Sequence, residues 1–373
     1  MSGVGARPLG ALVIGAGPAG LASSRELQRR GVTHRVLERG ALPGWVWANL
    51  YDSLTLHTGR HMSHLPGRAF ARGTPLFVPR ATFVHYLDDY VAHFALPVDA
   101  GVDVTSLHRH DGTWVAETSR GLLSARTVVL ATGIVSNPRM PELAGREGYG
   151  GELFHSSAYR RPAPFVGKRV LVVGIGNSGG EIGAELARAG AQVTVAVRSG
   201  AHVVPRDLGG IPIQYLAYLV RKLPRGAQEV VSDLVRRLGE AKRGPPVLPR
   251  PAHAVLDTIP LIGFNLVDEI RAGRIAVRPG IERLTPDGAR FTDGREEEFD
   301  TIILATGFRS AVQPLGALVR LDERGFGVRR DRVVSADQEA LFYVGHNYDS
   351  SGGLSNIRWD APLAADRVAE RLR

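Results

Sequence analysis

The chain has 373 residues, of which 44% are hydrophobic and 22% charged, values typical of a folded globular protein and unlike those of a disordered or fibrous chain. It contains no cysteine, which excludes disulfides, thiolate metal sites, iron–sulfur clusters and a dithiol redox couple. The net charge of +9 is scattered without a basic block, so small ligands that carry phosphates are favoured over nucleic acid.

The N-terminal segment predicts a strand, a tight turn and a helix. Residues 11–14 are a short apolar run that ends at glycine, and residues 21–30 follow with helical spacing. The turn reads G-x-G-x-x-G, which supplies one glycine for the turn, one for close approach to a pyrophosphate and one for packing; a bare turn is the alternative. The candidate contacts are Gly15, Gly17, Pro18, Ala19 and Gly20.

An acidic residue closes the next predicted strand, residues 34–37. Glu38 lies 38 − 15 = 23 residues beyond Gly15, where a carboxylate can accept hydrogen bonds from ribose hydroxyls. The strand, the glycine motif, the helix and the acidic residue follow one another at the expected spacing. This favours a dinucleotide site over a bare turn.

The same segment argues against a targeting sequence. The apolar residues 12–22 are broken by glycine and proline and follow no basic leader, and no run elsewhere reaches the roughly 18 apolar residues of a membrane span. We therefore expect a cytoplasmic protein without stable membrane insertion.

A second unit of the same kind begins with a predicted strand over residues 169–173, followed by a helix over about 178–189 and a strand over 192–197. Here the residue at the place of Glu38 is Arg198, 198 − 174 = 24 residues beyond the first glycine. A guanidinium can bind a 2′-phosphate, so NADPH is preferred to NADH; a solvated loop arginine is the alternative. Asn177 and Ser178 are also typical helix caps. The candidate contacts are Gly174, Gly176, Asn177, Ser178, Gly179 and Arg198.

Both units later reach a meander with glycine turns and then a buried strand that ends in Ala-Thr-Gly, at residues 131–133 and 305–307. This indicates a divergent internal duplication. After residue 307 only a strand (341–344) and a helix (360–372) remain, too little for a third domain. We therefore expect an α/β protein with two Rossmann-like dinucleotide-binding domains of the three-layer ββα type. The first comprises residues 1–160 and 308–373, and the second, 161–307, is inserted into it through a proline-containing linker.

The chain resembles the flavin-containing monooxygenase family, the class B flavoprotein monooxygenases, through most of its length. Tyr149-x-Gly151-x-x-x-His155-x-x-x-Tyr159 resembles the family motif F-x-G-x-x-x-H-x-x-x-(Y/F/W), with Tyr149 in place of Phe. Tyr159 stands where Baeyer–Villiger enzymes carry Trp. Residues 51–57, 174–181, 197–206 and 304–310 look closest to the YUCCA branch, which converts indole-3-pyruvate to indole-3-acetate, and His57 replaces the Asn of liver-type members.

The resemblance implies that NADPH reduces FAD, that dioxygen adds at the flavin C4a position, and that retained NADP⁺ shields the adduct from water. The partners are then dioxygen and a small-molecule substrate, either an α-keto acid or a soft nitrogen or sulfur centre, and a homodimer is allowed. The candidate catalytic residues are His57 and Asn177. Further candidate cofactor contacts are Trp47, His57, Thr132, Gly133, Ser199, Thr306, Gly307, Gly345 and Leu354.

Several histidines, two arginines and one apolar segment have more than one interpretation. His57, His61 and His64 have spacings that a metal site on a helix would show, although Gly59 and Pro66 disfavour that helix and a segment near the flavin is preferred. His155 is expected to position the linker or NADP⁺ rather than to move protons. Arg60 and Arg206 fit either phosphate or acidic-substrate contacts or a plain surface position. Residues 211–223 fit a substrate lid first, and also a packed helix, a dimer surface or an interfacial helix.

Other functions share parts of this pattern. A disulfide reductase has the paired motifs but needs a dithiol, which this chain lacks. Baeyer–Villiger oxygenation, a ferredoxin-reductase-like carrier that passes electrons from NADPH to flavin, and a nucleotide-sensing scaffold without turnover remain as alternatives.

Overall fold

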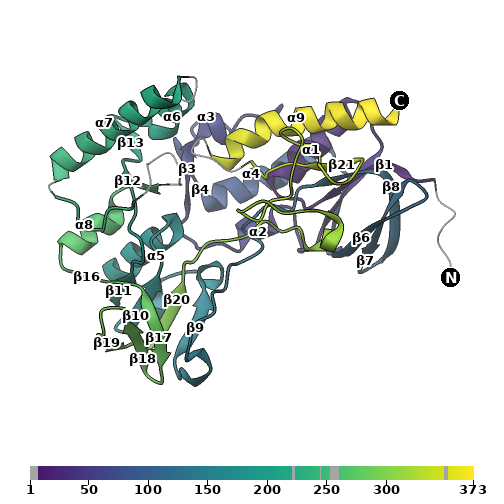
Figure 1. The fold of residues 1–373 in the computed structure, drawn as a ribbon. Coiled ribbons are helices and arrows are strands. Elements are labelled where there is room, and N and C mark those ends of the chain that lie inside the picture. Colours follow the sequence, from purple (N-terminus) through teal and green to yellow (C-terminus); the bar gives the residue numbers. More distant parts are fainter. Residues whose placement is uncertain (1–6, 221–222, 244, 253–259, 348–351) are drawn as a thin grey trace. The chain divides into compact units, whose positions relative to one another are not determined.

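The computed structural model describes residues 7–220, 223–243, 245–252, 260–347 and 352–373 (Figure 1). Their contacts divide the chain into two compact units: unit 1 comprises residues 7–137, 308–347 and 352–373, and unit 2 comprises residues within 138–307. Residues 138–160 thus belong to unit 2, whereas the sequence placed them with the first domain. They do so because β9 (Glu152–His155) pairs in parallel with β20 (Thr301–Leu304).

Unit 1 is built on a seven-stranded sheet with the order β5-β2-β1-β8-β7-β6, in which β21 pairs with the end of β8. The central strands run parallel, and β6, β7 and the start of β8 form an antiparallel meander. The bounds are β1 (Leu9–Ile14), β2 (His34–Glu38), β5 (Val98–Ala100), β6 (Val104–His110), β7 (Thr113–Thr118), β8 (Gly121–Leu130) and β21 (Leu341–Tyr343).

The central strand β1 is buried on both faces, because alternate residues enter two different cores. Ala11 and Val13 pack in the core that contains residues of the helices α1 and α9, whereas Leu12 and Ile14 pack in the core beneath the meander. The result is a helix layer, a parallel sheet and a meander layer, as the sequence predicted.

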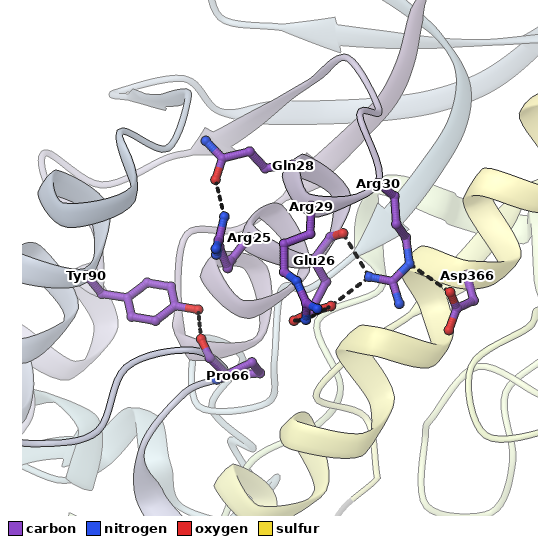
Figure 2. Close-up of polar contacts among 8 residues, drawn as sticks. All are labelled: Arg25, Glu26, Gln28, Arg29, Arg30, Pro66, Tyr90 and Asp366. Carbon is purple, nitrogen blue, oxygen red and sulfur yellow. Dashed lines mark hydrogen bonds and ion pairs between the residues drawn. The ribbon is translucent and has the colours of Figure 1, made fainter.

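The helices of unit 1 are α1 (Pro18–Arg29), α2 (Trp45–Ala48), α3 (Arg60–Ser63), α4 (Arg80–Phe94) and α9 (Gly353–Leu372), with a small sheet of β3 (Thr55–Gly59) and β4 (Phe77–Pro79). An ion-pair cluster joins α1 to α9 (Figure 2). The buried carboxylate of Glu26 accepts from Arg30 Nη1 at 2.6 Å, and Arg30 Nε donates to Asp366 at 2.7 Å. Tyr90 of α4 donates to the Pro66 carbonyl at 2.6 Å in the same region.

The final helix is longer than the sequence predicted, since α9 begins at Gly353 and not at residue 360. Its buried face continues towards the N-terminus through Ile357 and Leu354, which pack in the same core as Ala361. Gly353 has a low helix propensity, but this packing holds it in the first turn of α9.

Unit 2 contains a five-stranded, fully parallel sheet with the order β16-β11-β10-β20-β9 and a separate antiparallel sheet β17-β18-β19. The helices α5 and α8 contact the parallel sheet (Figure 1). The strand bounds are β10 (Arg169–Val173), β11 (Gln192–Ala196), β16 (Ile275–Arg278), β17 (Ile281–Thr285), β18 (Gly288–Phe291) and β19 (Glu296–Glu298); the helices are α5 (Asn177–Arg188) and α8 (Asn265–Arg271).

The remaining part of unit 2 holds two-residue strands and two helices: β12 (Val203–Val204), β13 (Asp207–Leu208), β14 (Ile211–Pro212), β15 (Leu261–Ile262), α6 (Ile213–Val220) and α7 (Arg225–Arg243). Ile211 and Leu219 are each 61% exposed. The described part of residues 211–223, the predicted lid, therefore carries apolar side chains on the surface of the described chain. Within the described ranges, none of the helices has the length and apolarity that a bilayer crossing requires.

Candidate nucleotide-binding sites

Two of the three glycines in the first motif are required by the protein itself. Gly15 has φ +100°, and a Cβ there would lie 2.8 Å from the Ala131 carbonyl oxygen. A Cβ on Gly20 would lie 1.7 Å from the Gly15 carbonyl oxygen. The turn and the contact between α1 and β1 therefore exclude any side chain at these positions.

The conformation and packing of the protein do not require the middle glycine. Gly17 has φ −74° and ψ −176°, an extended conformation open to any residue, and a Cβ there would meet nothing within 4 Å. Neither backbone strain nor packing within the chain explains a glycine at this position. Close approach of a ligand does, because the backbone of a dinucleotide motif must reach the pyrophosphate.

The second motif repeats this division of roles. Gly174 has φ +94° and a Cβ there would lie 2.7 Å from the Ala305 carbonyl oxygen, whereas a Cβ on Gly179 would lie 2.0 Å from the Gly174 carbonyl oxygen. Gly176 is extended, with φ −65° and ψ −177°, and its Cβ would meet nothing. The chain thus has two open glycine turns of the same kind, here called the first cradle (Gly15 to Gly20) and the second cradle (Gly174 to Gly179). Both fit a pyrophosphate.

The starts of α1 and α5 present backbone N–H groups without a side-chain cap. The N-cap residues are Gly17 and Gly176, and neither helix receives a capping hydrogen bond from a side chain. Asn177, which the sequence allowed as a cap, instead accepts a hydrogen bond from the Ile262 amide at 2.8 Å and fastens β15 to α5. Uncapped N–H groups at a helix start are a ready anion site.

Glu38 is fixed at the end of β2, directly beside the first motif. Its Oε2 accepts from the Ala16 amide and its Oε1 from the Gly40 amide, each at 2.8 Å, and the residue is buried. Each carboxylate oxygen keeps a further lone pair, so the group can also accept hydrogen bonds from ribose hydroxyls.

Arg198 is not the structural equivalent of Glu38, as the sequence predicted, but the residue after it. Gly15 donates to the carbonyl of Leu37 and Gly174 to that of Ala196, so the equivalent of Glu38 is Val197, which is buried. Arg198 follows as an exposed residue and makes no ion pair with any described residue. The glycine and the strand residue it bonds are 22 residues apart in both units (37 − 15 and 196 − 174), so Arg198, at 24, lies one residue past the position of Glu38, at 23.

The two Ala-Thr-Gly ends are held by their threonine hydroxyls. Thr132 Oγ1 donates to the Ala311 carbonyl, and Thr306 Oγ1 donates to the Arg139 carbonyl at 2.5 Å. Gly133 and Gly307 have φ of +65° and +83°, conformations that favour glycine, and a Cβ on either would meet nothing within 4 Å. Each threonine hydroxyl thus bonds a carbonyl of its own unit.

His57 and Trp47 lie in unit 1 on different elements. His57 is half-buried in β3, and Trp47 of α2 packs edge-on against Phe83 with ring centroids 4.8 Å apart. His57 is in a strand, and His61 and His64 lie in and directly after the four-residue α3, so the three do not share one helix. Among the described residues no group of potential ligands could hold a metal ion.

Two glycines that precede α9 lie against other elements of unit 1. A Cβ on Gly345 would lie 2.8 Å from the Ala19 Cβ, and one on Gly352 would lie 2.7 Å from Thr58 Cγ2. Leu354 is buried in the helix-side core. Ser199 follows Arg198 on the exposed surface of unit 2, and Ser178 lies in the first turn of α5.

His155 at the end of β9 has a defined tautomer. Its Nδ1 accepts from the Ser157 amide at 3.1 Å, so Nε2 carries the proton and donates to the Gly307 carbonyl at 3.0 Å. Burial lowers the pKa of His155, which keeps it neutral. It thereby ties β9 to the Ala-Thr-Gly turn of unit 2, the geometry of a positioning residue.

Sequence reasoning missed a buried polar network around the start of α9. Asp360 has no exposed surface, and its carboxylate accepts from Arg332 Nε at 2.9 Å and from Asn347 Nδ2 at 2.7 Å. Asn356 Nδ2 donates to the Asn347 carbonyl at 3.1 Å. Burial raises the pKa of Asp360 in spite of these partners. No spacing in the sequence signals this network, because Arg332, Asn347 and the α9 residues Asn356 and Asp360 come from three separate segments.

A second missed residue, His346, gives unit 1 a pH dependence. It is 2% exposed, its Nδ1 lies 3.2 Å from Ser310 Oγ, and burial lowers its pKa to about 3. His346 has the ordinary pKa of 6.5 in the unfolded chain and a much lower pKa in the folded chain. The unfolded chain therefore binds a proton more readily, so the free energy of unfolding falls as the pH decreases below 6.5. Lowering the pH from 7 to 5 should cost about 2 kcal/mol through this residue.

Replacing His346 with Asn, which can keep the Ser310 contact, should flatten this decline in urea unfolding measured at pH 7 and pH 5. His110→Asn is the control, because the His110 side chain is 71% exposed. An H346N protein that loses as much stability as the wild type over this range would show that His346 is not the source.

Comparison with known proteins identifies relatives of this chain. Residues 12–207 match the pyridine nucleotide-disulphide oxidoreductase family model. The chain is 36% identical over 314 residues to a YUCCA-group indole-3-pyruvate monooxygenase from Oryza sativa subsp. japonica, a match that covers 81% of this chain and 77% of that protein. A flavin monooxygenase variant from Stenotrophomonas maltophilia is 25% identical with a TM-score of 0.79, covering 98% and 99% of the two chains.

A further solved structure shares the fold: cyclohexanone monooxygenase from Rhodococcus sp. Phi1 bound to NADP⁺, with a TM-score of 0.75 at 20% identity and coverage of 98% of this chain and 85% of that one. Fold, paired motifs and relatives together define a flavin-dependent oxidoreductase that also uses a nicotinamide nucleotide. The chain belongs to the class B flavin-containing monooxygenase family, in its YUCCA-like branch, which confirms the family resemblance seen in the sequence.

Proposed function

We propose that this protein is an FAD-dependent, NADPH-driven monooxygenase in which unit 1 holds FAD and unit 2 holds NADPH. The observation that carries the proposal is the open space at Gly17 and Gly176, which leaves ligand approach as the reason for both glycines. Glu38 beside the first cradle suits an adenosine ribose, and Arg198 beside the second suits a 2′-phosphate.

Bound FAD would supply the redox chemistry of hydride acceptance from NADPH and oxygen transfer from dioxygen. The chain's own residues bind and orient. The uncapped N–H groups of α1 and α5 would bind the pyrophosphates, and Glu38 would accept from ribose hydroxyls. His155 holds the Gly307 turn beside the second cradle.

For the substrate we propose a small 2-oxo acid that undergoes oxidative decarboxylation. Support comes from the relatives named indole-3-pyruvate monooxygenases, and from His57 at the place of the liver-type Asn. Oxygenation of a nitrogen or sulfur centre is the second candidate within the same chemistry.

The first test is spectroscopic. Purified protein should be yellow, carry about one FAD per chain, and lose its flavin absorbance when NADPH is added without oxygen. A protein that takes up no FAD, or whose flavin stays oxidised with NADPH, would remove the basis of the proposal.

Coenzyme choice tests Arg198. Replacing Arg198 with Ala should raise KM for NADPH by about 10- to 100-fold, the effect of losing one charge-assisted contact, and should leave KM for NADH nearly unchanged. Steady-state NADPH and NADH oxidation measures both. Arg295→Ala is a matched control in the same unit, because Arg295 is exposed and faces Asp293. Unaltered discrimination in R198A would show that another group selects the coenzyme.

A further inference from the structure

Four basic side chains gather where α3 meets α9 in unit 1: Arg60, His61, His64 and Arg358, here called the α3–α9 basic cluster. Arg358 Nη1 donates to the His61 carbonyl at 2.8 Å, and Arg60 Nε donates to His61 Nε2 at 3.3 Å. Burial lowers the pKa of His64, and the charges of Arg358 and His61 lower it further, so His64 lies close to both.

The two arginines of this cluster have no acidic partner among the residues that the structure describes. Both are half-buried, and their hydrogen bonds to the chain, other than the one to His61 Nε2, go to main-chain carbonyls, Arg60 to Thr74 and Arg358 to His61. Neighbouring arginines differ: Arg80 pairs with Asp52 at 2.9 Å, and Arg68 faces Asp89 at 3.9 Å.

Half-buried guanidinium groups that keep unused donors, without a carboxylate, are suited to bind an anion from outside the chain. Hydrogen bonds to the described residues use Arg60 Nε and Nη1 and only Nη1 of Arg358, which leaves Arg60 Nη2 and Arg358 Nε and Nη2 available within that part of the chain. A carboxylate accepts from a guanidinium edge with two oxygens at once.

The cluster lies next to elements that contact the first nucleotide motif. Arg60 follows β3, the strand of His57, and Thr58 of that strand packs against Gly352 at the start of α9. Gly345, which follows β21, packs against Ala19 of α1. The basic cluster and the first cradle therefore share one set of connected elements within unit 1.

We propose that Arg60 and Arg358 form a subsite for the carboxylate of a 2-oxo acid substrate. The inference rests on the proposed function for the identity of the ligand. A phosphate of a bound nucleotide offers the same anionic chemistry, so the experiment separates the two sources.

The test uses FAD-loaded, oxidised protein without NADPH, so that it reports binding and not turnover. Isothermal titration calorimetry with indole-3-pyruvate, and with its methyl ester as a neutral probe, compares wild type with Arg60→Gln, Arg358→Gln and the control Arg68→Gln. We expect R60Q and R358Q to bind the acid about 10- to 100-fold more weakly, the ester about equally, and R68Q to behave as wild type. Arg→Lys variants should recover part of the acid affinity, because the charge remains.

The outcomes divide cleanly. The subsite is overturned if wild type does not bind the acid, or if R60Q and R358Q bind it as tightly as wild type. It is also overturned if the two variants bind acid and ester more weakly by the same factor. A third contrary result is that the variants lose FAD, or show a raised KM for NADPH, while their affinity for the acid is unchanged. The last result would assign the cluster to a nucleotide phosphate. If wild type binds the acid through these arginines but forms no oxygenated product, the subsite stands and the proposed function fails.

Discussion

Replacing Gly17 with alanine is expected to leave unit 1 folded and to abolish FAD binding. The backbone conformation at Gly17 accepts any residue, and the added methyl group meets no atom of the chain within 4 Å. The same methyl group would occupy the space that a pyrophosphate needs, so FAD retention should fall by at least about tenfold. Flavin content after gel filtration, together with the thermal midpoint of the FAD-free protein, measures the two effects separately.

The matched control is Gly20→Ala in the same motif. Its Cβ would overlap the Gly15 carbonyl oxygen at 1.7 Å, so this variant should be destabilised by about 3 kcal/mol or more, with or without FAD. The assignment of the first cradle fails if the Gly17 variant retains FAD at the wild-type level, or if it loses stability as the Gly20 variant does.

The equivalent change in unit 2, Gly176→Ala, should remove NADPH without touching FAD. The open space and extended backbone at Gly176 match those at Gly17, so the chain tolerates the methyl group and a pyrophosphate does not. We expect a yellow protein whose flavin NADPH reduces at least about tenfold more slowly at subsaturating concentration, whereas dithionite reduces it normally.

Stopped-flow reduction without oxygen measures this rate, and Gly226→Ala is the control, because Gly226 also has open space around its Cβ but lies outside both motifs. Loss of FAD from G176A, or NADPH reduction at the wild-type rate, would contradict the assignment of the two nucleotides to the two units.

Much of the fold could be predicted from the sequence, because local signals and tertiary packing agree there. The strands at residues 11–14, 169–173 and 301–304 are short apolar runs buried on both faces, and the structure confirms them. The turn at Asp111-Gly112 has positive φ at both residues, as its sequence predicted for a hairpin. The outer glycines of both motifs follow the same logic, since positive φ or close backbone packing requires each of them.

Other features depend on contacts between distant segments and were not predictable. The start of α9 was placed too late in the sequence, because packing overrides the low helix propensity of Gly353. The position of Arg198 relative to Glu38 became clear only from the strand register. The network of Asp360 and the basic cluster of Arg60 and Arg358 each bring together residues far apart in the chain, and no spacing rule relates them.

The most direct test of a two-nucleotide monooxygenase is the fate of dioxygen. Wild-type enzyme supplied with NADPH, indole-3-pyruvate and ¹⁸O₂ should yield indole-3-acetate in which mass spectrometry finds one labelled oxygen atom, with NADPH oxidised in step with product. Unlabelled product, or NADPH oxidation that sends all oxygen to hydrogen peroxide whatever keto acid, amine or sulfide is offered, would contradict the account.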